Sequence, residues 1–347
     1  MTTKVQHFVW RNYLKRWTNE NSSNGKIFVY RKKTIGTQPQ FPDNPVLLTN
    51  VGFGKYYYDV TGFSQKDVVL LEKLIEHMEK KSPVKMHLNF DVLPEARDNR
   101  DFIENILGQY ENIDNRHGFI DYIVNNNLSF YRDGIAQTTL NELLDEIQYR
   151  IFFGEESQPD EELYAKFLKA MENVTAEDVK HEFHRFFFMQ YFRAPVIIDA
   201  QRKSFDDLKR TYPDKIGDID TDFYVKMSMI FLTEKVALNI SHNFHTWIER
   251  LENITDIPFV TSDTPVINLT GTEFLDKNEF YFPVSPYVAM KLCITRKNGS
   301  YGKVDNKNFI VDDSDKIRRL NMEIVKHCQN EIFADRRNIL EQIVNEI

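Results

Sequence analysis

Apolar and polar positions alternate along the chain in two different ways. Near the N-terminus (KIFVYRK) and again after Ile257 (IPFVTSDTPVINL and FYFPVSPYVAMKLCITR), short aromatic and β-branched runs are bounded by turn residues, which predicts strands. Between these regions, apolar residues recur every three or four positions with charged residues among them, and that spacing is typical of amphipathic helices. The first such series is Val68, Leu71, Leu74, Ile75 and Met78.

The helical spacing fills the middle of the chain and returns at its C-terminal end. Capping patterns such as TAED at 175–178 mark where some of these helices begin. The predicted helices cover residues 65–81, 99–113, 117–127, 139–152, 160–171, 175–192, 202–211, 219–251, 314–329 and 335–346.

Strands at both ends of the chain therefore bracket a helical middle, which predicts an α+β fold. We expect N-terminal and C-terminal strands to build one mixed or antiparallel sheet, with a large helical middle region packed on it. The expected organisation is one large domain over 1–347. In the alternative, residues 65–251 form a helical subdomain inserted between the sheet-forming segments 1–64 and 252–347.

Composition narrows the classes of partner. The 27 Phe and 16 Tyr are spread along the whole chain, as in a protein packed throughout. A formal net charge of −8 argues against a surface wholly committed to a phosphate backbone. The first 33 residues nevertheless hold many Lys and Arg against Glu20 alone. This basic N-terminal element either helps to hold nucleic acid or is simply a solvated surface.

The setting expected from the sequence is cytoplasmic, with no membrane partner. The two cysteines, Cys293 and Cys328, lie far apart and without metal-ligand spacing, so neither a disulfide framework nor a zinc ribbon is indicated. The N-terminus lacks the apolar segment of a signal peptide, and no apolar run reaches about 18 residues. The oligomeric state is left open.

Two His-x-x-His pairs stand out among titratable residues: His181 with His184, and His242 with His245. On a helix, residues three apart share a face, so either pair could supply two imidazoles to a metal ion. A third ligand is missing in both cases. The alternative is a pair of histidines on a helix surface or at the edge of the core.

Two polar stretches are candidates for chemistry. FVTSDTPV ends a strand-like run in Ser262 and Asp263, where Asp263 would serve as a base or metal ligand. Alternatively, both side chains cap the turn before Pro265. In MQYFRAP, Gln190 and Arg193 are three residues apart in apolar surroundings, where a guanidinium either pairs with a buried carboxylate or faces an anionic ligand.

Other templates for catalysis are not met. FYFPVSPY places Ser285 between two prolines, which indicates either a rigid turn between strands or an edge strand that cannot pair further, and gives little support to a serine nucleophile. Gly-x-Ser-x-Gly, Walker A and Gly-x-Gly-x-x-Gly patterns are all missing from the sequence, so the common hydrolase, P-loop and Rossmann templates do not apply.

Taken together, these stretches resemble the bacterial and phage proteins grouped as domain of unknown function 4238. The opening QHFVWRNYLKRW and the following KIFVYRK are similar to that family's Gln-His aromatic element and strand, although Trp10 and Arg11 stand where the family usually has proline. The other matching stretches are Gln190 to Pro195, Thr261 to Pro265, Phe282 to Pro286, and the pair Leu320-Asn321. Members of that family occur in mobile-element and phage-defence neighbourhoods, so the resemblance implies nucleic-acid chemistry or sensing.

The resemblance groups the suspect residues into one hypothetical cleft. In it, His7 is the general acid or base, Asp263 orients His7 or holds a divalent cation, and Arg193 stabilises negative charge. Substrate contacts would come from Gln6, Gln190, Ser262 and Asn321. The alternative is a buried hydrogen-bond network that pins the sheet to the helices.

Two functions follow from these alternatives. The first is a nuclease or other phosphate-handling enzyme of a bacterial defence or mobile-element system, with a divalent cation as one option for its cofactor. The second is a non-catalytic sensor or adaptor that binds a phage protein or a small ligand. The expected partner is accordingly a nucleic acid or a protein. A third, purely structural role would need an exposed apolar face.

Overall fold

The structure is a computed structural model that describes residues 5–9, 11–18, 25–32, 39–55, 183–184, 187–271, 277–297 and 306–346. The chain divides into two compact units. The first consists of Met1–Gln6, Lys55–Val179 and Ile198–Val236, and the second of His7–Gly54, Lys180–Ile197 and Ala237–Ile347. The predicted helices between 65 and 171 lie outside the described residues. That residues 65–251 form an inserted helical subdomain stays a proposal.

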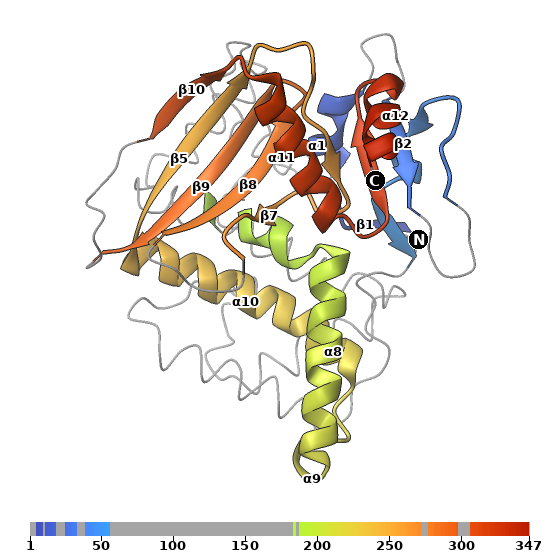
Figure 1. The fold of residues 1–347 in the computed structure, drawn as a ribbon. Coiled ribbons are helices and arrows are strands. Elements are labelled where there is room, and N and C mark those ends of the chain that lie inside the picture. The colour runs from blue at the N-terminus through green and yellow to red at the C-terminus, as the bar shows by residue number, and fades with distance from the viewer. Residues whose placement is uncertain are drawn as a thin grey trace, which may run out of the picture. The chain divides into compact units, whose positions relative to one another are not determined.

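The second unit contains a five-stranded sheet (Figure 1). β10 and β5 run parallel to each other, and every other neighbouring pair is antiparallel. β8 and β9 form a hairpin in which the Ser285 Oγ accepts the N–H of Val288 at 3.0 Å, so the predicted turn in FYFPVSPY is confirmed. The strand order is β10 (Lys307–Val311), β5 (Phe244–Asn253), β9 (Val288–Arg296), β8 (Lys277–Ser285) and β7 (Ile267–Asn268).

A four-stranded antiparallel sheet joins the two ends of the chain. Its order is β3 (Val46–Leu47), β2 (Lys26–Arg31), β11 (Glu331–Ala334) and β6 (Thr261–Ser262). N-terminal β2 pairs with C-terminal β11, which confirms the predicted sharing of strands and the α+β class. A further two-stranded sheet pairs β1 (Val5–His7) with β4 (Phe53–Lys55).

The opening element packs into the core. Tyr13 in α1 (Arg11–Leu14) and Trp17 in the 3-10 turn η1 (Lys15–Trp17) are buried and reach segments far along the chain. The Tyr13 hydroxyl donates to the carbonyl of Pro283 at 2.7 Å, and Trp17 Nε1 donates to the carbonyl of Phe259 at 3.3 Å. The opening element is therefore part of the buried core.

Lys32, which directly follows β2, holds the C-terminal end of helix α11 (Ser314–His327). The Lys32 ammonium donates to the carbonyls of Val325 at 2.6 Å and Cys328 at 2.9 Å. A positive charge there complements the helix dipole and adds a donor to carbonyls at the end of the helix. At the other end, the Asp313 carboxylate accepts main-chain N–H groups as the N-cap.

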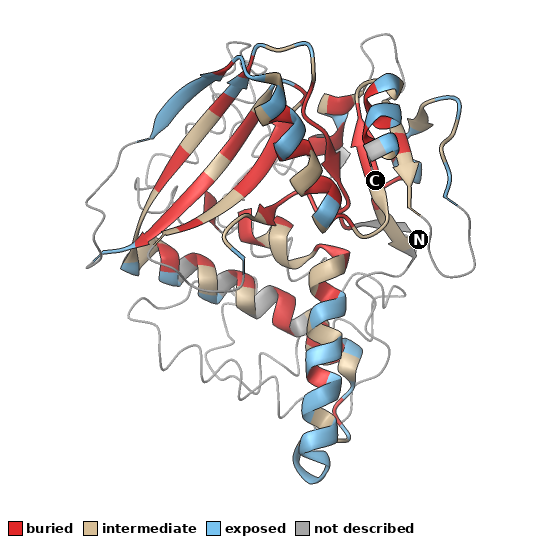
Figure 2. Cartoon of the chain, viewed as in Figure 1, coloured by how far each residue is buried: buried red, intermediate tan, exposed pale blue. Residues whose placement is uncertain are grey.

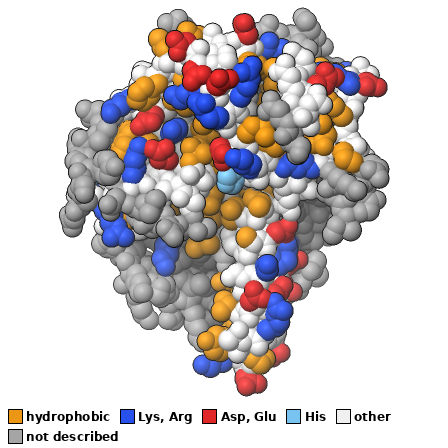
Figure 3. All heavy atoms as spheres, viewed as in Figure 1, with side chains coloured by type: hydrophobic (Ala, Val, Ile, Leu, Met, Phe, Trp, Pro, Cys, Tyr) orange, Lys and Arg blue, Asp and Glu red, His pale blue; other side chains and the backbone are white. Residues whose placement is uncertain are grey.

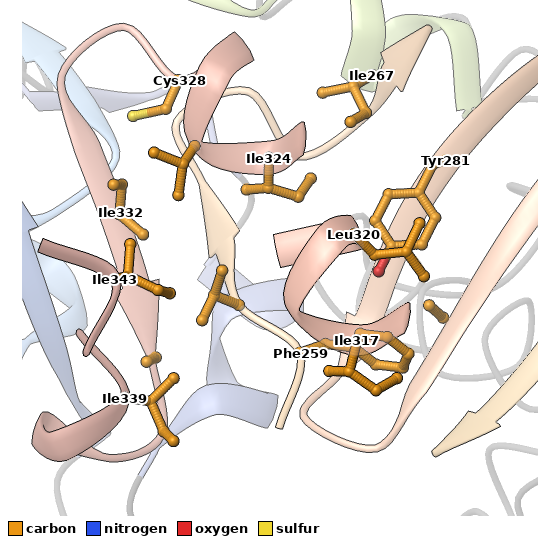
Figure 4. Packing of buried hydrophobic residues seen from close by; sticks show 14 of the residues in the cluster. Phe259, Ile267, Tyr281, Ile317, Leu320, Ile324, Cys328, Ile332, Ile339 and Ile343 are labelled. Atoms are coloured by element: carbon orange, nitrogen blue, oxygen red, sulfur yellow. The ribbon is translucent and has the colours of Figure 1, made fainter. Parts of the chain in front are cut away.

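The apolar face of α11 forms the centre of the main core (Figure 4). Ile317, Leu320 and Ile324 are spaced three and four residues apart, so they share the face that points to the five-stranded sheet. Tyr281 of β8 and Ile332 of β11 belong to the same cluster, so this helix packs against strands of both sheets. α12 (Arg337–Glu346) adds Ile339, Leu340 and Ile343.

The helices α8 (Pro195–Thr211), α9 (Pro213–Ile216) and α10 (Thr221–Asn243) follow one another in the chain and lead into β5. The predicted helix 202–211 lies within α8, but the predicted helix 219–251 is wrong after Asn243, because residues 244–253 form β5. That strand pairs with β9 on one side and β10 on the other. Tertiary pairing here overrides the local spacing. Within the described residues, no helix has the length and hydropathy that a membrane span needs.

Candidate functional site

Asp263 follows β6 and is completely buried. One carboxylate oxygen accepts the main-chain N–H of Gln329 at 3.0 Å, and the other accepts those of Asn330 at 2.6 Å and Glu331 at 3.1 Å. Its own N–H donates to the carbonyl of Glu331 at 2.9 Å. Both oxygens are therefore committed to the turn that leads from α11 into β11.

Burial governs the electrostatics around this carboxyl group. Burial raises the pKa of Asp263 above its ordinary value of 3.8, and the N–H groups of Gln329, Asn330 and Glu331 lower it by less. Cys328 lies beside it, and burial together with the charge of Asp263 raises the pKa of that thiol well above 9.0. A thiol in this state is a poor nucleophile at neutral pH. The contacts of the Asp263 carboxylate therefore stabilise the turn between α11 and β11.

Ser262 and Asn321 are also buried and also bind main chain. The Ser262 hydroxyl donates to the carbonyl of Thr264 and accepts its N–H, both at 3.1 Å, as expected for a side chain that caps its own turn. The Asn321 amide donates to the carbonyl of Pro258 at 2.9 Å and accepts the N–H of Val260 at 3.0 Å. Together with Asp263, these side chains tie segment 258–264 to α11 and to the turn after it.

Gln190 and Arg193 lie on a different element, at the end of the helical segment 187–192. Gln190 is buried, and Arg193 is half-buried with its Nε inaccessible to solvent. The main chain turns at Arg193, whose N–H donates to the carbonyl of Met189 at 3.1 Å, and Pro195 then begins α8. Proline suits this first helical position because its missing N–H would have no partner there.

Four aromatic rings of this helical segment and one ring of β8 contact one another. We call them the aromatic group: Phe187, Phe188, Tyr191, Phe192 and Phe280. Phe280 projects from β8 on the face opposite Tyr281 and α11. Its ring meets those of Phe188 and Tyr191 edge to face at 5.4 Å. Tyr191, Phe192 and Phe280 are only half-buried. Arg193 follows Phe192 directly in the chain.

The remaining sequence candidates are placed by their main chain. Gln6 and His7 lie in β1, and the contacts of their side chains are outside what the structure describes. Ser262 and Asp263 lie in segment 258–264, and Asn321 reaches that segment from α11. The meeting of His7 with Arg193 and Asp263 in one cleft stays a prediction.

One of the two histidine pairs departs from the helical arrangement that its spacing suggested. His184 is buried with Nδ1 2.8 Å from the hydroxyl of Ser241, whereas His181 lies outside the described residues. His242 is near the end of α10 and His245 is in β5, so these two do not share a helical face. Among the residues that the structure describes, no three His, Cys, Asp or Glu side chains gather closely enough to hold a metal ion.

An ionic cluster on the five-stranded sheet was not identified from the sequence. Lys277 pairs with Glu279 and lies 4.0 Å from Glu249, while Lys291 is 3.3 Å from Glu279. The Lys277 ammonium also lies 5.3 Å from the centre of the Trp247 ring. The sequence signal for this cluster is a pair of charged residues two positions apart in an apolar strand, as in the KNE that opens β8. Alternate residues of a strand share a face, so such charges lie side by side.

We expect Glu279→Gln to destabilise the fold in a pH-dependent way. Burial raises the pKa of Glu279, but hydrogen bonds and charges from Lys277 and Lys291 outweigh it and leave the pKa below 4.5. The ionised form is therefore favoured by folding, so its contribution is present above the unfolded pKa and disappears as pH falls through the folded pKa. The substitution should cost about 1 kcal/mol near neutral pH and almost nothing in acid. Urea unfolding at both pH values measures this, and an equal cost in acid would contradict it.

Comparison with known proteins gives a family and no further relative. No curated protein and no solved structure matches this chain. One family model matches residues 5–87 and 155–338, which include the opening element, the Gln190 to Pro195 segment, β6 with Asp263, the β8–β9 hairpin and α11. The chain belongs to the family described as Protein of unknown function (DUF4238).

Proposed function

We propose that this protein is a non-catalytic binding protein, a sensor or adaptor. The observation that carries the proposal is the state of Asp263, the carboxylate on which acid–base or metal chemistry was expected to depend. It is completely buried, and three main-chain N–H groups occupy its two oxygens. A catalytic base must come within hydrogen-bond reach of the proton that it removes. Asp263 would have to leave its turn to do so.

The ligand surface that we propose is the aromatic group with Arg193. Half-buried rings at Tyr191, Phe192 and Phe280 supply apolar contact at low cost in conformational entropy. A guanidinium beside them adds recognition of negative charge, with directional donors. Ligands that combine a flat ring with an anionic group match this chemistry, and nucleotides are the simplest probes of it.

The charge distribution favours a small ligand or a protein over a long phosphate backbone. In Figure 3, positive and negative side chains are intermixed over the face in view, and hydrophobic side chains lie between them. The net charge of the chain is −8. Binding along a nucleic-acid backbone usually depends on a continuous basic surface. The biological setting that we propose, conflict between bacteria and phage or mobile elements, rests on the family resemblance alone.

The competing proposal is a nuclease or other phosphate-handling enzyme that uses His7 and Arg193. Binding and turnover can be followed in the same mixtures of protein and nucleoside mono- and triphosphates, with and without Mg²⁺. With the nucleotide at 100 times its Kd, a sensor should be stabilised against unfolding by about 2.7 kcal/mol, which raises its unfolding temperature. The nucleotide should be recovered unchanged. Arg193→Ala and Arg193→Lys should weaken the stabilisation.

The control for these variants is Arg319→Ala, because the Arg319 side chain is 70 % exposed on α11 and lies outside the aromatic group. It should leave the ligand-induced shift unchanged. Consumption of nucleotide that disappears in His7→Ala, while the thermal shift persists, would establish the enzyme instead. If no nucleotide shifts the unfolding temperature, the aromatic group is not a nucleotide site.

A further inference from the structure

Strand β10 (Lys307–Val311) is the outer strand of the five-stranded sheet (Figure 1). Four of its five residues are exposed, whereas β5, β9 and β8 consist almost wholly of buried and half-buried residues (Figure 2). The exposed residues include two large apolar side chains, Phe309 at 39 % and Ile310 at 71 %. An exposed apolar edge of this kind is a template for pairing with another strand.

The main-chain groups of β10 that point away from β5 can be assigned residue by residue. Val311 accepts the N–H of Ile254 at 3.1 Å, so its main-chain groups point to the β5 side. Main-chain groups alternate in direction along a strand. The N–H and C=O of Asn308 and Ile310 therefore point away from β5. In the described part of the chain, no strand pairs with that side.

Charges flank this edge with opposite signs at its two ends. Lys307 begins the strand, and the exposed pair Asp312 and Asp313 follows it. An antiparallel copy of the same sequence brings the basic end of one strand to the acidic end of the other, twice over. Such self-complementarity is what an isologous twofold interface requires.

We propose that β10 pairs antiparallel with β10 of a second copy of this chain, around a twofold axis at Ile310. In that register Ile310 faces its own copy, Asn308 faces Asp312 of the second copy, and Lys307 faces Asp313 of the second copy. The outward main-chain groups of Asn308 and Ile310 then become hydrogen-bonded pairs, and one sheet runs through both chains. The inference is independent of the proposed function.

The test is the mass of the full-length protein in solution, measured by sedimentation over a range of concentrations. The wild type should approach twice the 41.1 kDa of one chain. Ile310→Pro removes the outward N–H at an edge position where proline is tolerated, so it should return the protein to the mass of one chain. Ile310→Val keeps both the N–H and the β-branched side chain and should remain a dimer.

Circular dichroism shows whether Ile310→Pro has kept its fold. If it has not, Ile310→Lys gives the same test, since two lysines facing each other across the axis should also leave single chains. Added salt should weaken the wild-type dimer, because Lys307 and Asp313 of the second copy are exposed charges. A wild type of single-chain mass at every concentration would overturn the proposal. A dimer that survives both Ile310→Pro and Ile310→Lys would overturn it equally, because it must use another surface.

Discussion

Asp263→Asn should lower the free energy of unfolding by about 3 to 5 kcal/mol, the largest effect that we expect from a single substitution. An amide keeps only one acceptor oxygen and turns its NH₂ toward main-chain N–H groups that need an acceptor. The N–H groups of Gln329, Asn330 and Glu331 then compete for one oxygen in a buried position. Urea unfolding followed by tryptophan fluorescence reports the effect, since Trp17 and Trp247 lie in the same compact unit as Asp263.

The matched control is Asp214→Asn, at an exposed aspartate in α9. Its unfolding free energy should stay within about 0.5 kcal/mol of the wild type. If Asp263→Asn were as stable as this control, the carboxylate would not be holding the turn before β11. Its burial would then need another explanation, and a catalytic role would regain support.

Asn321→Ala should cost about 2 to 4 kcal/mol, the second largest effect. The substitution leaves the N–H of Val260 and the carbonyl of Pro258 buried without their partner. Alanine's better helix propensity returns only about 0.5 kcal/mol of this. The same urea titration measures the loss.

Arg319→Ala serves as the control in the same helix, because that side chain is 70 % exposed and its ion pair with Asp313 is long at 3.5 Å. Exposed pairs of this kind contribute about 0 to 1 kcal/mol. Equal losses in the two variants would mean that Asn321 does not fix α11 to segment 258–264.

Local patterns were sufficient for the elements whose contacts repeat along one face. The predicted helix 314–329 corresponds to α11, whose Ile317, Leu320 and Ile324 share one buried face, and the turn residues around Ser285 predicted the turn of the β8–β9 hairpin. The predicted joining of N-terminal and C-terminal strands holds in the pairing of β2 with β11. Residues 244–253 failed because their conformation is decided by β9 and β10, which lie 35 or more residues later in the chain.

The site shows the same limit. The sequence marked Ser262, Asp263 and Asn321, and all three are buried polar residues with several hydrogen bonds each. For Ser262 the local turn was correctly considered as an alternative, because its partner Thr264 is two residues away. For Asp263 the partners lie 66 to 68 residues later, where no local pattern reveals them. A polar residue can thus be picked out by its pattern while its role depends on distant main chain.

The described residues thus include a buried part with a structural role and accessible surfaces that could bind a partner. Segment 258–264, α11 and the turn before β11 form a buried hydrogen-bonded core, which includes Asp263 and Asn321. The half-buried rings of the aromatic group and the exposed Phe309 and Ile310 of β10 are apolar side chains that solvent reaches. Binding at these surfaces, with a fixed core beneath them, is the account that we favour over chemistry at Asp263.

The most direct test of that account is a cleavage assay on the purified full-length protein. Labelled single- and double-stranded DNA and RNA are incubated with the wild type and with His7→Ala, in Mg²⁺ or Mn²⁺, and the products are resolved by length. We expect every substrate to remain intact with both proteins. Cleavage by the wild type that falls at least about 100-fold in His7→Ala, with an unchanged unfolding midpoint, would contradict the account and establish an enzyme.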